Sequence, residues 1–131
     1  MDHVLAAIDG SDNSMRALAF AADLAARYDA ELHAVHVSDG ETAATEEIFD
    51  RAREVLADSD VTAEVELRQT TEMSVRSARA AAKELLAYVA DEQVDHVVMG
   101  HHGAGRVERA MLGSASETVV RGATVPVTVV P

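Results

Sequence analysis

The stretch HVLAAIDGSDNSMRAL, residues 3–18, contains the pattern that decides the fold. Its first part, residues 3–8, is a near-continuous apolar run of the kind found in a strand buried on both faces of a sheet. The turn-forming and helix-capping residues at positions 9–12 end this run. Apolar residues then recur at helical spacing over residues 13–28. The stretch therefore predicts a buried strand followed by an amphipathic helix.

The same alternation of strand and helix patterns continues to the end of the chain. Further strands are predicted over residues 31–37, 61–67, 96–99 and 125–130. The strand over 61–67 alternates apolar and polar residues strictly, so we expect it at an edge of the sheet with one face in water. Pro126 has no backbone N–H and belongs at the start of the last strand or on an exposed edge. Strands separated by helices predict an α/β fold, a five-stranded parallel sheet with helices on both faces, as a single domain over residues 1–131.

The composition is that of a globular protein, with 48% hydrophobic and 26% charged residues in a chain of 131. No apolar run approaches the roughly 20 residues that a membrane-spanning helix needs. The first residues lack the basic segment of a signal peptide, and cysteine is absent, which excludes disulfides and thiolate metal sites. We therefore expect a cytoplasmic protein with no membrane partner.

The charge balance is strongly acidic, with a formal net charge of −12 and Lys83 as the single lysine. Such a surface repels the phosphates of nucleic acids, so we expect no nucleic-acid partner. An acidic, lysine-poor surface is also typical of proteins adapted to high salt. An ordinary acidic protein is the alternative that the composition leaves open.

A second informative stretch is MGHHGAGRVERAMLGSAS, residues 99–116, which includes the end of the predicted fourth strand. In open parallel sheets, ligands bind beyond the carboxyl ends of the strands, where the strand order reverses. Asp9, residues 37–39 and the residues that follow Met99 all lie at such strand ends. This stretch is therefore where we expect a ligand.

Three familiar kinds of site are not encoded there. A P-loop needs a lysine and a hydroxyl residue where Arg106 and Val107 stand. A dinucleotide fingerprint needs a third glycine where Glu108 stands. His101 and His102 are adjacent, so their side chains diverge, and no histidine pair at helical spacing accompanies them. We expect them to be loop histidines, and we expect no metal ion held by the protein alone.

What remains is the spacing G-x2-G-x9-G-S, made by Gly100, Gly103, Gly113 and Ser114. The first two glycines let the backbone pass close to a ligand, because they carry no Cβ. The third precedes the predicted last helix, whose free N–H groups and dipole favour an anion, with the Ser114 and Ser116 hydroxyls as further donors. Alternatively, the S-x-x-E sequence that starts at Ser114 is a capping box that begins a helix without any ligand. The residues alone leave both interpretations open.

With this spacing, the chain resembles the universal stress protein family over essentially its whole length. The other segments that carry the resemblance are AAIDGSDNSMRAL at residues 6–18, HVSD at 36–39 and ATVPVTVV at 123–130. The resemblance implies a Rossmann-like sheet of the adenine nucleotide α-hydrolase-like type and membership of the ATP-binding subgroup. The chain departs from the family at residues 68–83, which lack the glycine turn and nearby proline that commonly follow the third strand.

The resemblance also implies a binding site for ATP, AMP or ADP. Asp9 and Val37 would lie on the adenine side, Gly100 and Gly103 beside the ribose and α-phosphate, and Gly113 with the two serines at the phosphates. A Mg²⁺ or Mn²⁺ ion would be carried through the phosphates. The roles of Arg106 and Arg109 stay undecided. The implied nucleotide-binding residues are Asp9, Val37, Met99, Gly100, Gly103, Gly113, Ser114 and Ser116.

The function that follows is a nucleotide-dependent regulatory or stress-response module, and the family resemblance implies a homodimer formed through residues 125–130. No catalytic residue is identified, because the loop has no lysine and no convincing general base. Two alternatives remain open: a slow ATPase, and a dimeric stress-response module that binds no ATP or binds another small ligand.

Overall fold

The computed structural model describes residues 1–69, 78–101 and 112–131. Within these ranges the chain alternates between strand and helix from β1 to β5, as predicted. The elements are β1 His3–Ala7, α1 Asp12–Tyr28, β2 Glu31–Ser38, α2 Ala43–Leu56, β3 Ala63–Gln69, α3 Ala78–Asp91, β4 His96–Gly100, α4 Ser114–Gly122 and β5 Val127–Val130. The apolar pattern also predicts a third helix with Val75 as its first apolar residue and Ser74 as its cap, and both residues lie outside the described residues.

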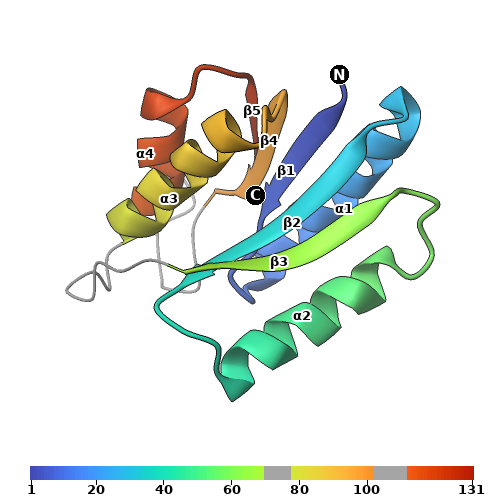
Figure 1. Ribbon diagram of the computed structural model, residues 1–131, viewed down its shortest axis with the longest axis horizontal. Coiled ribbons are helices and arrows are strands. Elements are labelled where there is room, and N and C mark those ends of the chain that lie inside the picture. The colour runs from blue at the N-terminus through green and yellow to red at the C-terminus, as the bar shows by residue number, and fades with distance from the viewer. Residues whose placement is uncertain (70–77, 102–111) are drawn as a thin grey trace.

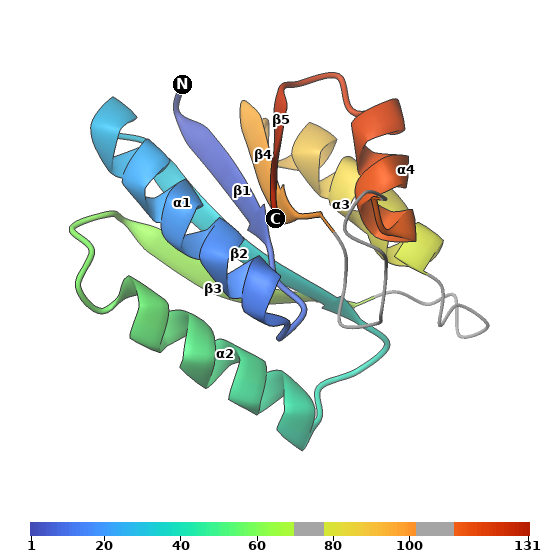
Figure 2. The ribbon, with the colours of Figure 1, turned by 180° about the vertical axis from the view of Figure 1, so that it is seen from behind.

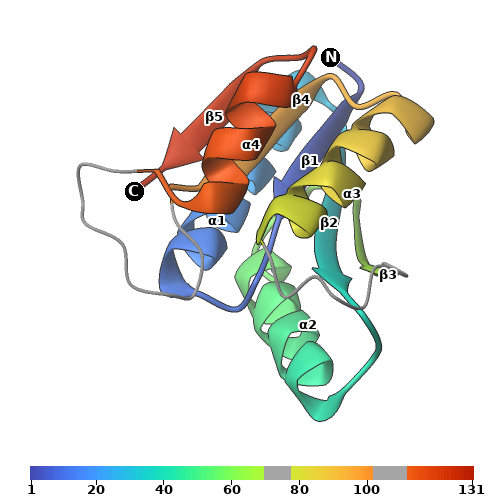
Figure 3. The ribbon, with the colours of Figure 1, turned by 90° about the vertical axis from the view of Figure 1, so that its left-hand side faces the viewer.

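The strands form one parallel five-stranded sheet in the order β3-β2-β1-β4-β5 (Figure 1). Helices α1 and α2 cover one face, and α3 and α4 cover the other (Figures 2 and 3). The predicted fold class is confirmed. The strictly alternating strand, β3, lies at one edge as expected, and Pro126 directly precedes β5 at the other. None of the helices in the described ranges is both long and apolar enough to cross a membrane.

The core has two layers, because successive residues of each strand point to opposite faces of the sheet. On β1, Val4 and Ala6 pack under α1 and α2, whereas Leu5 packs under α3 and α4. Tyr88 of α3 is the largest fully buried side chain of the described residues, and burial, reinforced by the nearby Glu66 carboxylate, raises the pKa of its phenol. The continuous apolar run of β1 is thus explained by burial on both sides.

The helix starts are set by capping residues. The Ser11 hydroxyl accepts from the Ser14 N–H and begins α1, and Thr42 with Thr45 forms a capping box that begins α2 at Ala43. The capping box suggested at Ser114 does not form. Gly113 is the N-cap of α4, no side-chain hydrogen bond caps this helix in the described part of the chain, and Glu117 pairs with Arg121 instead.

A candidate ligand site at the strand-order reversal

The strand order reverses between β1 and β4, which are neighbours in the sheet. The chain runs outward from β1 through β2 to β3 and then returns to the other side of β1 for β4 and β5. The carboxyl ends of β1 and β4 therefore lie at the place in the sheet where doubly wound proteins bind ligands. We call the groups gathered there, Asp9, Asn13, Gly100, Gly113 and Ser116, the switch site.

Asp9 shapes the turn that leaves β1. Its Oδ1 accepts from the Ser11 N–H at 2.9 Å and from the Ser11 hydroxyl at 2.5 Å. Gly10 has φ 85°, a left-handed conformation that favours glycine, so the chain can reverse direction tightly before α1. The structure therefore gives Asp9 a turn-forming role, and a contact with a ligand remains a prediction.

Asn13, in the first turn of α1, joins this turn to the end of β4. It is 2% exposed, its Oδ1 lies 2.8 Å from the Ser11 Oγ, and its Nδ2 lies 3.3 Å from His101 Nδ1. A Cβ added to Gly100 would lie 2.5 Å from Asn13 Oδ1 and 2.8 Å from its Cγ. Gly100 is therefore required for the close approach of β4 to α1. Sequence reasoning missed Asn13; the available signal was a polar residue directly after the turn on a helix that packs on the sheet.

Two hydrogen bonds fix the start of α4 against the end of β4. The Ser116 hydroxyl donates to the Gly100 carbonyl oxygen at 2.7 Å, and the Gly113 N–H donates to the His101 carbonyl oxygen at 2.7 Å. Ser116 is 2% exposed, whereas Ser114 is exposed at the first position of the helix. The structure thus brings Gly100, Gly113 and Ser116 together, with the Ser116 proton engaged by the Gly100 carbonyl.

The remaining predicted residues are placed as follows. Met99 is buried in the core layer under α3 and α4, and Val37 is a half-buried residue near the end of β2 that packs against the same layer. Both side chains thus belong to the apolar layer at the carboxyl ends of their strands. Gly103 lies outside the described residues, as do His102, Arg106 and Arg109.

The electrostatics at the start of α4 favour an anion. The first N–H groups of a helix have no intrahelical partner, and the helix dipole places partial positive charge there. No side chain caps these groups in the described part of the chain, and the Glu117 carboxylate lies 3.1 Å from an Arg121 guanidinium nitrogen. This ion pair offsets the negative charge of the first turn. The N–H groups at the start of α4 can therefore donate hydrogen bonds to the oxygens of an anionic ligand.

The strand order, the two helical layers and the groups at the reversal define a doubly wound parallel α/β protein. The sequence matches the universal stress protein family over residues 1–131, and the chain belongs to this family.

Known proteins agree with this assignment. A universal stress protein of Thermus aquaticus is 33% identical in an alignment 136 residues long. The alignment covers 97% of this chain and 96% of that protein. A universal stress protein of Archaeoglobus fulgidus, solved in complex with dAMP, superimposes with a TM-score of 0.75 at 19% identity and covers 100% of this chain and 98% of its own. Another universal stress protein, solved in complex with cAMP, gives a TM-score of 0.65 at 22% identity, with coverage of 99% and 97%. Both structures share the fold described above.

Proposed function

We propose that this chain, as one domain over residues 1–131, binds an adenine nucleotide at the switch site and acts as a nucleotide-dependent regulatory or stress-response module. The observation that carries the proposal is the convergence of Gly100, Gly113 and Ser116 beside the start of α4. Among the described residues, no side chain caps this helix. Two proteins of the same fold bind dAMP and cAMP, which supports an adenylyl ligand.

Each group has a proposed task. The adenine would lie beside Asp9 and Val37. The ribose and α-phosphate would lie beside Met99, Gly100 and Gly103. The phosphates would bind at Gly113 and Ser114. Ser116 acts by holding the Gly100 carbonyl against α4, because its own proton is used there. A Mg²⁺ or Mn²⁺ ion bound with the nucleotide would neutralise phosphate charge and be carried by the phosphates.

We propose binding and not hydrolysis as the main activity. The switch site offers fixed hydrogen-bond donors and a backbone that a ligand can approach closely, and nucleotide binding requires both. Hydrolysis also needs an aligned water and charge stabilisation of the transferred phosphoryl group. Slow ATP hydrolysis is the second candidate, and phosphate release under single-turnover conditions measures it directly.

The test is recovery of the ligand together with titration. The tag-free protein, purified without added nucleotide and denatured, should release an adenine nucleotide that mass spectrometry identifies as AMP, ADP or ATP. The emptied protein should then bind ATP with Mg²⁺ in isothermal titration, measured over a series of KCl concentrations because the net charge of −12 opposes an anion most strongly at low salt. An absence of co-purified nucleotide together with flat titrations at every salt concentration contradicts the proposal.

The proposed assembly is a homodimer that pairs the β5 edges of two copies. The Pro126 carbonyl oxygen accepts from the Val97 N–H of β4, and the Val130 carbonyl oxygen accepts from the N–H of His101, the residue after β4. The N–H and C=O groups of Val127 and Val129 therefore face the open edge. An apolar edge strand with such groups is a template for pairing with another chain. These groups support a dimer through residues 125–130.

Replacement of Val129 by proline should convert the dimer into a monomer while the fold is retained. Proline removes an outward N–H and leaves the hydrogen bonds to β4 in place. Size-exclusion chromatography with light scattering measures the mass, and far-UV circular dichroism checks the fold. The matched control is Val129→Thr, which keeps the N–H and should remain dimeric; a dimeric proline variant rules out this edge.

A further inference from the structure

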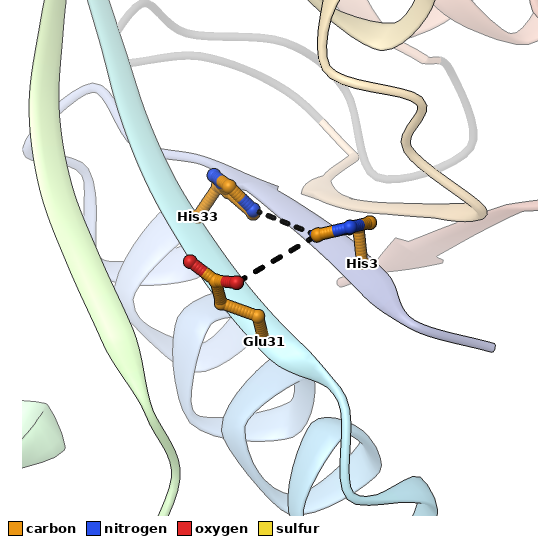
Figure 4. A group of neighbouring side chains, drawn as sticks. All are labelled: His3, Glu31 and His33. Atoms are coloured by element: carbon orange, nitrogen blue, oxygen red, sulfur yellow. Dashed lines mark hydrogen bonds and ion pairs between the residues drawn. The ribbon is translucent and has the colours of Figure 1, made fainter.

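At the amino end of the sheet, opposite to the switch site, two histidines and a glutamate converge. His3 is the first residue of β1, and Glu31 is the first residue of β2, and these two residues are direct partners in the parallel register. His33 follows two positions after Glu31, so all three side chains lie on the same face of the sheet. Figure 4 shows the three side chains turned toward one another. We call them the histidine cluster.

The spacing of their atoms fits a transition-metal ion. His3 Nδ1 lies 3.2 Å from His33 Nε2 and 3.9 Å from Glu31 Oε2. Two imidazole nitrogens bound to one tetrahedral Zn²⁺ at about 2.05 Å are separated by about 3.3 Å. The two histidines thus already have the separation that a shared ion requires. The Glu31 carboxylate, which is 37% exposed, must approach His3 Nδ1 by about 0.6 Å.

The surroundings orient the buried histidine as a ligand. His33 Nδ1 lies 2.8 Å from the Tyr88 hydroxyl oxygen, and burial together with the nearby Glu66 carboxylate raises the pKa of that hydroxyl. The Tyr88 oxygen can accept from His33 Nδ1–H, and metal binding through Nε2 requires this arrangement. The lone pair of His33 is then on Nε2, the atom that faces His3. A hydrogen bond at the second imidazole nitrogen is the usual support of a metal-bound histidine.

The histidine cluster is also open to solvent on one side, so a metal ion could reach it. His33 is 5% exposed and closes the inner side, whereas the side chains of His3 and Glu31 are 34% and 37% exposed and open toward solvent. The alternative is a plain hydrogen bond from His3 Nδ1–H to His33 Nε2. Metal binding needs the His3 proton on Nε2 instead, a change of tautomer that leaves the number of bound protons unchanged.

We propose that His3, Glu31 and His33 bind a divalent first-row transition-metal ion, with Zn²⁺ as the best match to two imidazoles and a carboxylate. Three protein ligands leave a fourth position for water at the exposed side. Because the cluster is at the opposite end of β1 from Asp9, this ion is distinct from any ion carried by nucleotide phosphates.

The test is titration of the tag-free, chelator-treated full chain with Zn²⁺ alone. Isothermal titration should show one ion per chain, and Co²⁺ should give the visible absorption of a tetrahedral site. The variants His3→Gln and Glu31→Gln, on the exposed side of the cluster, should fold and lose affinity, with a loss of at least about 100-fold for His3→Gln, which removes a metal-bound nitrogen. Tyr88→Phe keeps the ring and removes only the hydroxyl, so it should weaken binding about tenfold.

The matched control is His96→Gln, which removes a partly buried histidine at the start of β4 that is hydrogen-bonded to Thr128 instead of joining the cluster. It should bind Zn²⁺ as the natural chain does, and circular dichroism should show every variant folded. The proposal is overturned if Zn²⁺ does not bind saturably, or if His3→Gln and His96→Gln change the affinity equally. Nucleotide titration is a separate readout, so the two proposals fail independently.

Discussion

The Gly100→Ala variant should be less stable than the natural chain by about 2 kcal/mol, within the range expected when a methyl group is forced into a packed interior. The added Cβ would lie 2.5 Å from Asn13 Oδ1 and 2.8 Å from Asn13 Cγ. Asn13 cannot easily move away, because it is 2% exposed and its amide contacts both Ser11 and His101. Urea denaturation measures the free energy of unfolding of each protein.

A double-mutant cycle identifies the cause of this loss. Asn13→Ala is itself destabilising, because it removes buried hydrogen bonds, but it also removes the two atoms nearest to the added Cβ. In that background, Gly100→Ala should cost less than about 1 kcal/mol, which corresponds to a coupling energy of more than about 1 kcal/mol. The same cost in both backgrounds would show that Asn13 is not the obstacle. The control is Gly40→Ala, whose Cβ would contact nothing within 4 Å.

The Gly113→Val variant should lose affinity for adenine nucleotide by at least about 100-fold. A branched side chain at the N-cap of α4 would stand where a phosphate must approach the free N–H groups, and two charge-assisted hydrogen bonds of about 1.5–3 kcal/mol each would be lost. Gly113 has φ −67° and ψ 164°, a conformation that valine also adopts, so backbone strain does not explain the loss. Isothermal titration with ATP and Mg²⁺ is the measurement.

Two controls separate this effect from a loss of fold. Gly40→Val places the same side chain in open space and should bind nucleotide normally. Ser114→Ala removes one exposed hydroxyl and should weaken binding by about tenfold at most. Unchanged affinity in a folded Gly113→Val protein would place the phosphates away from α4 and remove the main support for the switch site.

Most of the fold could be predicted because burial on two faces leaves a continuous apolar strand, and burial on one face leaves an alternating one. Residues 3–8 and 61–67 show the two patterns, and they become the central strand β1 and the edge strand β3. Element ends were less accurate. The start of α2 at Ala43 depends on hydrogen bonds between Thr42 and Thr45 that no apolar pattern reveals.

The candidate site was predicted in part. The glycine spacing indicated Gly100 and Gly113 because close packing and free helix ends need particular residues at fixed positions. It could not indicate Asn13, since the contact between Asn13 and Gly100 joins residues far apart in the sequence. The histidine cluster was missed for the same reason: His3 and His33 become neighbours only when β1 pairs with β2.

The two edges of the sheet differ in character, and this difference limits how copies can associate. The β3 edge carries Glu64, Glu66 and Arg68 on alternate positions, whereas β5 offers four half-buried residues without a charge. If both edges attracted other chains equally, copies could add without end into a fibrous sheet. In the proposed dimer, the β5 edges pair with each other and the charged β3 edges stay outside, so we expect addition to stop after the first partner. If the dimer forms as proposed, we expect the charged residues of β3 to oppose polymerisation and neutral substitutions along β3 to weaken that effect.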